Sequence, residues 1–174
     1  MSSKPHLSHK NLGNVRPTTG KVKESLTATL APYWEGARVL DLFAGSGSLG
    51  QAALDHGVSE LVLVEGHTRV ARQLSRDFKG CTVIAAILPL GLQRLEGSFD
   101  LVLADPPYGD PAGPATLAQL GPWVHDRTIV VFEHHHKDKF QDDYGFVKLW
   151  RRKRFGETAL SYYAGPAIAA DLAD

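Results

Sequence analysis

The sequence has little of what marks secreted or membrane-bound proteins. It contains one cysteine, Cys81, which excludes an internal disulfide framework and is typical of a reducing compartment. Its longest mainly apolar stretch, residues 82–92, is far shorter than a membrane span, and its first residues lack the apolar core of a secretory signal. We therefore expect a cytoplasmic protein that does not enter a membrane.

An excess of one charge is also missing, because 19 lysines and arginines balance 19 aspartates and glutamates. This balance excludes a uniformly basic protein of the kind that coats nucleic acid. The charge is nevertheless uneven, since residues 1–23 contain basic but no acidic side chains and Arg151 to Arg154 form a second basic cluster. With 43% apolar and 22% charged residues, the 174-residue chain has the composition of one globular domain.

The pattern divides the chain into three parts. Residues 1–15 are expected to form a flexible basic arm and residues 165–174 a loose tail. Between them, in residues 16–164, short apolar runs alternate with helical patterns, which indicates a parallel sheet with helices on both faces. The predicted strands cover 38–43, 60–65, 82–87, 99–104 and 128–132. The predicted helices run from Thr18 or Thr19 to Leu30, from a glycine turn to about Gly57, and over 68–78.

The end of the domain departs from this alternation. Residues 145–155 and 158–164 are strand-like, and only Gly156 and Glu157 separate them. This linker is too short for a crossover helix, so the two runs must form an antiparallel hairpin. A Rossmann-like α/β fold, with a doubly wound, mostly parallel sheet and a C-terminal antiparallel hairpin, is typical of class I methyltransferases.

A glycine turn follows the first predicted strand. Gly45 to Gly50 fits G-x-G-x-x-G, a pattern that serves NAD, FAD and S-adenosylmethionine alike. Asp41 at the lip of this turn would repel a pyrophosphate but attract the sulfonium and ammonium groups of S-adenosylmethionine. Glu65 ends the next strand and can accept hydrogen bonds from ribose hydroxyls. The alternatives are an Asp41 that only caps the turn and a Glu65 that is an ordinary strand-end charge.

The motif Asp105-Pro106-Pro107-Tyr108 follows another predicted strand. Its prolines fix the backbone and remove N–H donors, so Asp105 and the Pro106 carbonyl would accept hydrogen bonds from an exocyclic amine. These bonds would localise the lone pair of the amine and aim it at the sulfonium methyl group. Tyr108 offers a flat face on which a base can stack. A proline-rich turn without chemistry is the alternative.

Five segments together resemble the small 16S ribosomal RNA guanine-N2 methyltransferases of the RsmD type. These segments are RPTTGKVKESL (16–26), DLFAGSGSLG (41–50), VE (64–65), DPPY (105–108) and FGETALSYY (155–163). The resemblance implies the transfer of a methyl group from S-adenosylmethionine to a guanine N2 in ribosomal RNA or the small ribosomal subunit. We expect the chain to be a monomer. It implies cofactor contacts from Asp41, Phe43, Ala44, Gly45, Ser46, Gly47 and Glu65. It implies base contacts from Asp105, Pro106, Pro107 and Tyr108, with Arg16, Pro17 and Thr18 near the mouth of the site.

Two departures from this family leave alternatives open. The arm before Arg16 is short and lacks the family's Arg- and Gly-rich pattern, and residues 84–88 offer no acidic side chain for the adenine amine. A catalytically weak RNA-binding paralogue is therefore one alternative. N6-adenine methylation of RNA or DNA is another, because Asp105 to Tyr108 would suit either amine. A dinucleotide oxidoreductase is a more distant alternative, because it gives the Asp105 motif no role.

Other conspicuous residues are interpreted conservatively. Arg151, Arg152 and Arg154 would contact RNA phosphate or lie on a solvated face, and strand alternation sends only half of the cluster to one side. His134 to His136 are expected to form a solvated strand end without a metal, because neighbours on a strand point to opposite faces. Cys81 and the three tryptophans Trp34, Trp123 and Trp150 are interpreted as packing residues.

Overall fold

A computed structural model of the chain describes residues 19–174. The predicted basic arm, residues 1–15, and the predicted substrate contacts Arg16, Pro17 and Thr18 lie outside the described residues.

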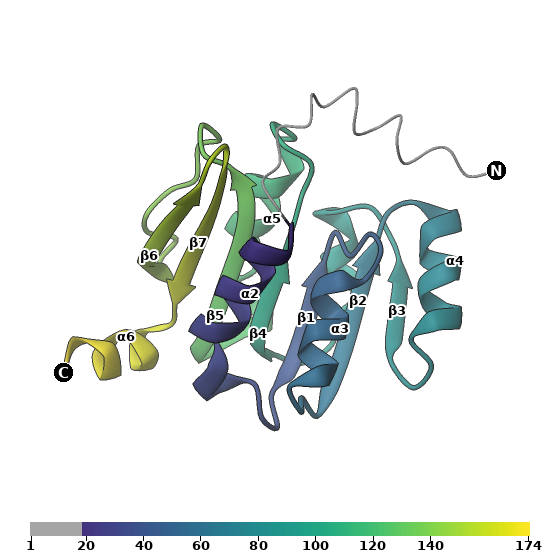
Figure 1. The fold of residues 1–174 in the computed structure, drawn as a ribbon, viewed down its shortest axis with the longest axis horizontal. Helices are drawn as coiled ribbons and strands as arrows, with labels where there is room; N and C mark the ends of the chain where they lie inside the picture. Colours follow the sequence, from purple (N-terminus) through teal and green to yellow (C-terminus); the bar gives the residue numbers. More distant parts are fainter. Residues whose placement is uncertain (1–18) are drawn as a thin grey trace.

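A seven-stranded sheet runs through the molecule in the order β3-β2-β1-β4-β5-β7-β6 (Figure 1). Strands β1 to β5 are parallel, and β7 pairs antiparallel with both β5 and β6. The predicted fold class, a mostly parallel sheet closed by an antiparallel hairpin, is therefore confirmed. The strands are β1 (Arg38–Leu42), β2 (Glu60–Glu65), β3 (Thr82–Ala85), β4 (Phe99–Ala104), β5 (Val124–His135), β6 (Lys148–Phe155) and β7 (Thr158–Ala164).

Helices cover both faces of this sheet. In Figure 1, α2 and α3 lie in front of the sheet, α4 lies at its right-hand edge beside β3, and α5 lies behind it. Leu74 of α4 packs in the same core as side chains of α2 and α3. The described helices are α2 (Thr19–Thr29), α3 (Ser48–Asp55), α4 (Thr68–Asp77), α5 (Ala112–Ala118) and α6 (Pro166–Ala173). Short 3₁₀ turns at 31–33, 90–94 and 121–123 complete the connections.

Side chains of the central strands alternate between two apolar cores. Val39 of β1 packs in the core beneath α2 to α4, whereas Leu40 packs in the core on the side of α5. Both side chains are fully buried, and burial of one such side chain stabilises the fold by roughly 1.5–3 kcal/mol. Because the alternation continues along β1, Asp41 shares the face of Val39 and lies under α3. The interpretation of the tryptophans as packing residues is confirmed, since Trp34 and Trp123 are buried and Trp150 packs against a core.

Strand β5 is longer than the sequence predicts. It continues beyond Phe132 through His134 and His135, because β7 pairs with it up to the register His135 to Thr158. Conversely, β6 begins at Lys148 rather than at Gly145, because a turn closed by the Tyr144 N–H on the Val147 carbonyl precedes it.

The prediction of a loose tail at residues 165–174 is wrong. Residues 166–173 form α6, and Ile168 is buried in the core beneath α2 to α4. Pro166 stands in the first turn of this helix, where its missing N–H has no cost. No helix within residues 19–174 combines the length and apolar character needed to cross a membrane.

Candidate active site

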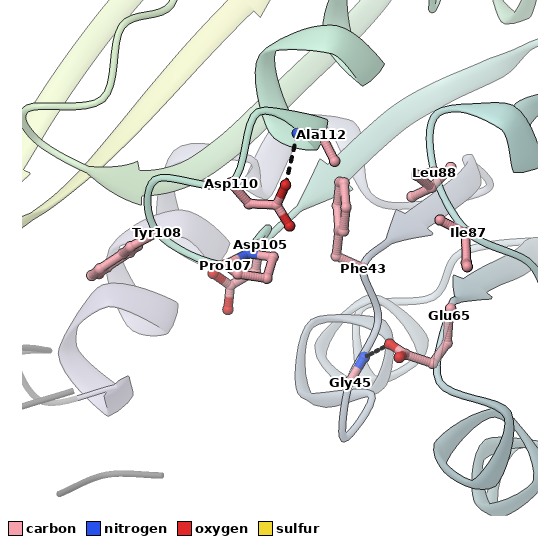
Figure 2. A pocket seen from close by; sticks show the side chains of 11 residues that line it. Phe43, Gly45, Glu65, Ile87, Leu88, Asp105, Pro107, Tyr108, Asp110 and Ala112 are labelled. Atoms are coloured by element: carbon pink, nitrogen blue, oxygen red, sulfur yellow. Dashed lines mark hydrogen bonds between the residues drawn. The ribbon is translucent and has the colours of Figure 1, made fainter. Parts of the chain in front are cut away.

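A pocket of about 710 Å³ opens where β1, β2 and β4 end, at the edge of the sheet where open α/β folds bind ligands (Figure 2). Its size is within the usual range of small-molecule and cofactor sites. The residues lining it are Phe43, Gly45, Glu65, Gly66, Ile87, Leu88, Asp105, Pro107, Tyr108, Asp110 and Ala112. The glycine turn and the Asp105 motif, which are far apart in the sequence, therefore share one cavity.

The glycine turn takes its shape from left-handed backbone at three positions. Phe43, Gly45 and Gly47 have φ values of 58°, 56° and 83°. A Cβ atom on Gly47 would lie 2.5 Å from Cε2 of Phe78, so both the backbone and the packing require glycine there. Phe43 is the one non-glycine residue with positive φ among residues 19–174, and its ring projects into the pocket in Figure 2. Such strain at a ligand site is typical of a backbone held for function.

Glu65 clamps this turn to the end of β2. Its Oε1 accepts the Gly45 N–H at 2.8 Å and its Oε2 accepts the His67 N–H at 2.9 Å. A carboxylate oxygen has two acceptor sites, so each oxygen can still accept a ribose hydroxyl from the pocket. Glu65 is therefore more than an ordinary strand-end charge.

Asp41 lies beneath the turn, outside the lining of the pocket. Its side chain is buried, and its Oδ2 accepts the Gly50 N–H at 3.1 Å. This contact is the one expected if Asp41 only caps the turn. Strand alternation places the Asp41 side chain on the face of the sheet that α3 covers. Burial raises the pKa of Asp41 well above its usual value, although the Gly50 N–H lowers it, and the nearby carboxylates of Asp105 and Glu65 raise it further.

Other predicted cofactor contacts are divided between two hollows. Gly45 lines the pocket, whereas Ser46 lines a groove between the turn and α4. Ala44 and Gly47 are outside the lining of both. Ala44 donates its N–H to the Val64 carbonyl, which ties the turn to β2.

The loop after β4 brings Asp105, Pro107 and Tyr108 to the opposite wall of the pocket. Pro106 is buried instead, and its ring packs so closely on Gly113 of α5 that a Cβ there would lie 3.0 Å from Pro106 Cγ. The ring therefore anchors the loop, and only the carbonyl of Pro106 is a candidate for contact with a substrate.

Tyr108 connects this loop to the closing hairpin. Its hydroxyl forms a hydrogen bond with the hydroxyl of Thr158, the first residue of β7. Its ring meets the His135 ring edge-on, with centroids 5.3 Å apart. The sequence did not indicate this link between the Asp105 motif and the FGET segment, because it depends on β7 lying beside β5.

The three histidines have different environments. His134 is buried, and its Nε2 lies 2.7 Å from the Ser161 hydroxyl, so the interpretation as a solvated strand end is wrong for this residue. Burial also lowers the pKa of His134. His135 and His136 stack with centroids 4.7 Å apart, because His136 lies beyond the end of β5, where strand alternation stops.

His135, His136 and Glu157 place potential metal-ligand atoms within 4.8 Å of one another. The His135 Nδ1 accepts the Lys137 N–H at 3.0 Å, so its proton is assigned to Nε2, which donates to Glu157 at 2.8 Å. A metal on Nε2 would need that proton on Nδ1 and would break the bond to Lys137. This geometry favours a hydrogen-bond network, and the absence of a metal stays a prediction.

The charged side chains that line the pocket are all acidic. Glu65, Asp105 and Asp110 line it, and among residues 19–174 no lysine or arginine does. Ile87 and Leu88 supply an apolar wall, and Ile87 is 72% exposed. This combination fits a cationic ligand with an apolar ring, such as S-adenosylmethionine, and disfavours the pyrophosphate of a dinucleotide.

Five residues that line the pocket were not indicated by the sequence: Gly66, Ile87, Leu88, Asp110 and Ala112. Of these, Asp110 had a local signal, because it is an acidic residue that closely follows a motif fixed by two prolines.

The basic residues of β6 are not brought into this pocket. Arg152 donates to the Ser161 hydroxyl at 2.7 Å, and Arg154 donates to the Gly156 carbonyl at 2.7 Å. Arg151 pairs in register with Tyr162 and Arg152 with Ser161, which confirms that alternation divides the cluster between two faces.

Comparison with known proteins identifies the family of the chain. The model of a family described as conserved hypothetical protein 95 matches residues 3–164. The chain belongs to this family, which is the RsmD family of methyltransferases. The Escherichia coli ribosomal RNA small subunit methyltransferase D is 29% identical over 174 residues, covering 92% of this chain and 84% of that protein. The Buchnera aphidicola protein of the same name is 29% identical, covering 75% of this chain and 73% of that protein.

Solved structures of similar proteins have the same fold. The E. coli protein yhhF, provisionally described as a methyltransferase, superimposes with a TM-score of 0.74 at 27% identity, covering 87% of this chain and 88% of that chain. A Streptococcus pyogenes protein described as conserved and hypothetical gives a TM-score of 0.74 at 28% identity. The match covers 82% of this chain and 94% of that chain.

Proposed function

We propose that the chain transfers a methyl group from S-adenosylmethionine to the exocyclic N2 of a guanine in 16S ribosomal RNA. The observation that carries this proposal is the single acidic pocket shared by the glycine turn and the Asp105 motif. The methyltransferase family and the names of the relatives support the reaction class and the ribosomal RNA substrate. A ribosomal substrate also implies that the enzyme acts in the cytoplasm.

The cofactor side of the pocket is formed by the turn and the ends of β2 and β3. Glu65 would accept the ribose hydroxyls, and Ile87 with Leu88 would contact the adenine ring. The carboxyl group of Asp41 is buried beneath the turn, and a cation bound above it would stabilise its ionised form. When bound, S-adenosylmethionine supplies a methyl group that is susceptible to nucleophilic attack.

The substrate side is formed by the loop after β4. Asp105 and the Pro106 carbonyl would accept both hydrogens of the guanine amine, which localises its lone pair and aims it along the line of displacement. As the amine nitrogen would bond to the methyl carbon, the bond from that carbon to sulfur would break and leave its electron pair on the sulfur. Asp105 is placed to take the proton that the positive nitrogen then loses. Tyr108, held by Thr158, would stack on the base.

The decisive experiment uses small ribosomal subunits that lack their methyl groups. The chain is incubated with them and with methyl-labelled S-adenosylmethionine, and the digested RNA is separated into nucleosides. Label in N2-methylguanosine is expected. Label in N6-methyladenosine would overturn the guanine assignment, because the same acceptors suit an adenine amine. Absence of cofactor binding at millimolar concentration in calorimetry would instead indicate a non-catalytic RNA-binding module.

A further inference from the structure

Helix α4 presents a stripe of arginines that the pocket does not use. Arg69, Arg72 and Arg76 are spaced three and four residues apart, which places them on one side of the helix. Ala71 and Leu74 are buried on the other side, against the sheet. All three arginines are exposed, and none forms an ion pair with a carboxylate within residues 19–174.

This stripe forms one wall of a groove of about 650 Å³ beside the glycine turn. Gly45 and Ser46 contribute the other wall, and Gly45 also lines the acidic pocket. The two hollows therefore adjoin, but their charges are opposite. The acidic pocket suits a cation, whereas the arginine-lined groove suits an anion.

Further basic side chains lie on the face of the sheet that α2, α3 and α4 cover. Lys23 of α2 donates to the Ser48 hydroxyl at the start of α3 at 3.1 Å. Lys153 of β6 donates to the Ser25 hydroxyl of α2 at 3.3 Å. We call Lys153, Lys23, Arg69, Arg72 and Arg76 the basic band. Glu24 on α2 is an exposed acid beside the band, and Asp77 on α4 lines the groove together with the three arginines and accepts a hydrogen bond from Gln73.

We propose that the basic band binds the phosphodiester backbone of the RNA substrate on the α2 to α4 face while the target base enters the acidic pocket. This inference rests on the proposed function. An RNA strand must bring phosphates close to an acidic pocket that repels them, and the band supplies the opposite charge immediately beside it. Arginine is well suited to this contact, because its planar guanidinium can donate two hydrogen bonds to one phosphate.

The test is the triple substitution R69Q/R72Q/R76Q, since glutamine removes the charge and keeps a high helix propensity. Affinity for a 16S ribosomal RNA fragment is measured by fluorescence anisotropy over a series of salt concentrations. The plot of log affinity against log salt is expected to become shallower by about 2, which corresponds to three lost phosphate contacts. Calorimetry with S-adenosylmethionine alone is expected to give wild-type affinity.

The matched control is R127Q. Arg127 is an exposed arginine near the start of β5, a strand that β1 and β4 separate from β2, and it pairs with Asp171 of α6. This variant is expected to keep the salt slope of the wild type. Circular dichroism melting shows whether each variant is folded.

The outcomes separate the two proposals. The triple variant could match R127Q in RNA affinity and salt slope while the wild type still methylates RNA. This result would overturn the proposed role of the basic band and leave the proposed function standing. Loss of binding to whole subunits but not to naked RNA points to a ribosomal protein partner and also overturns it. Loss of cofactor binding would show that the groove belongs to the cofactor. A wild-type chain that neither binds nor methylates ribosomal RNA overturns the proposed function as well.

Discussion

Asp105 is the residue on which the chemistry most depends. We expect Asp105→Ala to lower kcat for methyl transfer by about 100-fold or more, because the variant lacks the carboxylate that orients the amine and takes its proton. Affinity for S-adenosylmethionine should change little, since Glu65 and the glycine turn remain. Methyl-transfer kinetics and calorimetry measure the two effects separately. A kcat close to that of the wild type would contradict this role.

Asp41 is expected to make stability depend on pH. Burial raises its pKa in the folded state, so the stability associated with its protonated form is lost as the pH rises through that raised value. Asp41→Asn keeps an acceptor for the Gly50 N–H but cannot ionise. The Tm of the variant minus that of the wild type should therefore increase with pH. The increase should be about 2–4 °C for each kcal/mol of unfolding free energy that the wild type loses. Thermal melts from acidic to neutral pH measure this difference, and a constant difference would contradict the argument.

At the residue scale, sequence reasoning succeeded where a side chain acts close to its own motif. Gly45, Glu65, Asp105 and Tyr108 are in the pocket because each lies at or shortly after the end of a predicted strand, at the same edge of the sheet. Sequence reasoning wrongly placed Asp41 beside the cofactor, in the lining of the pocket. The sequence alone does not show which helix covers each face of the strand, so it could not show that Asp41 lies under α3.

At the scale of elements, the hydrogen bond between Tyr108 and Thr158 joins the loop after β4 to the hairpin. We expect Thr158→Val to lower kcat by about fivefold, the equivalent of one hydrogen bond of about 1 kcal/mol. Thr158→Ser restores the hydroxyl and should restore the rate, whereas a merely structural role of the methyl group would leave the serine variant impaired. Single-turnover kinetics on both variants, with Tm as the folding check, distinguish these cases.

Helix α6 is expected to contribute to stability through one side chain. Ile168→Ala should destabilise the chain by about 2–5 kcal/mol, because it empties a site in the core. Leu172→Ala on the same helix is the matched control, since Leu172 is 39% exposed. Urea unfolding measures both variants. Equal and small effects would mean that α6 does not stabilise the domain.

The elements predicted best were those that a local pattern defines completely. The bounds of β2, β4 and β7 are as the sequence predicts, because turn residues flank apolar runs on both sides. The extension of β5 and the packing of α6 depend on contacts with distant parts of the chain. Neither GPAIAADLAD nor His134 to His136 contains a local signal for such contacts.

At the scale of the whole molecule, the zero net charge conceals an acidic pocket beside a basic band. The two surfaces should respond differently to salt. RNA affinity of the wild type should fall steeply between 50 and 200 mM salt, by about tenfold or more, because several phosphates are neutralised. Affinity for S-adenosylmethionine should fall only slightly over this range, since the charges of a partly enclosed pocket are less screened. Anisotropy and calorimetry in the same buffers provide the comparison.

The strand order also has a consequence for how the chain is made. β7 is buried at every residue and lies between β5 and β6, although it is the last strand in the sequence. During synthesis, β5 therefore remains an unpaired edge until residues 158–164 have emerged from the ribosome, and β6 has no neighbour with which to pair. An open edge of this kind is a template for misassociation. The nascent chain should thus need protection until a late point in its own translation.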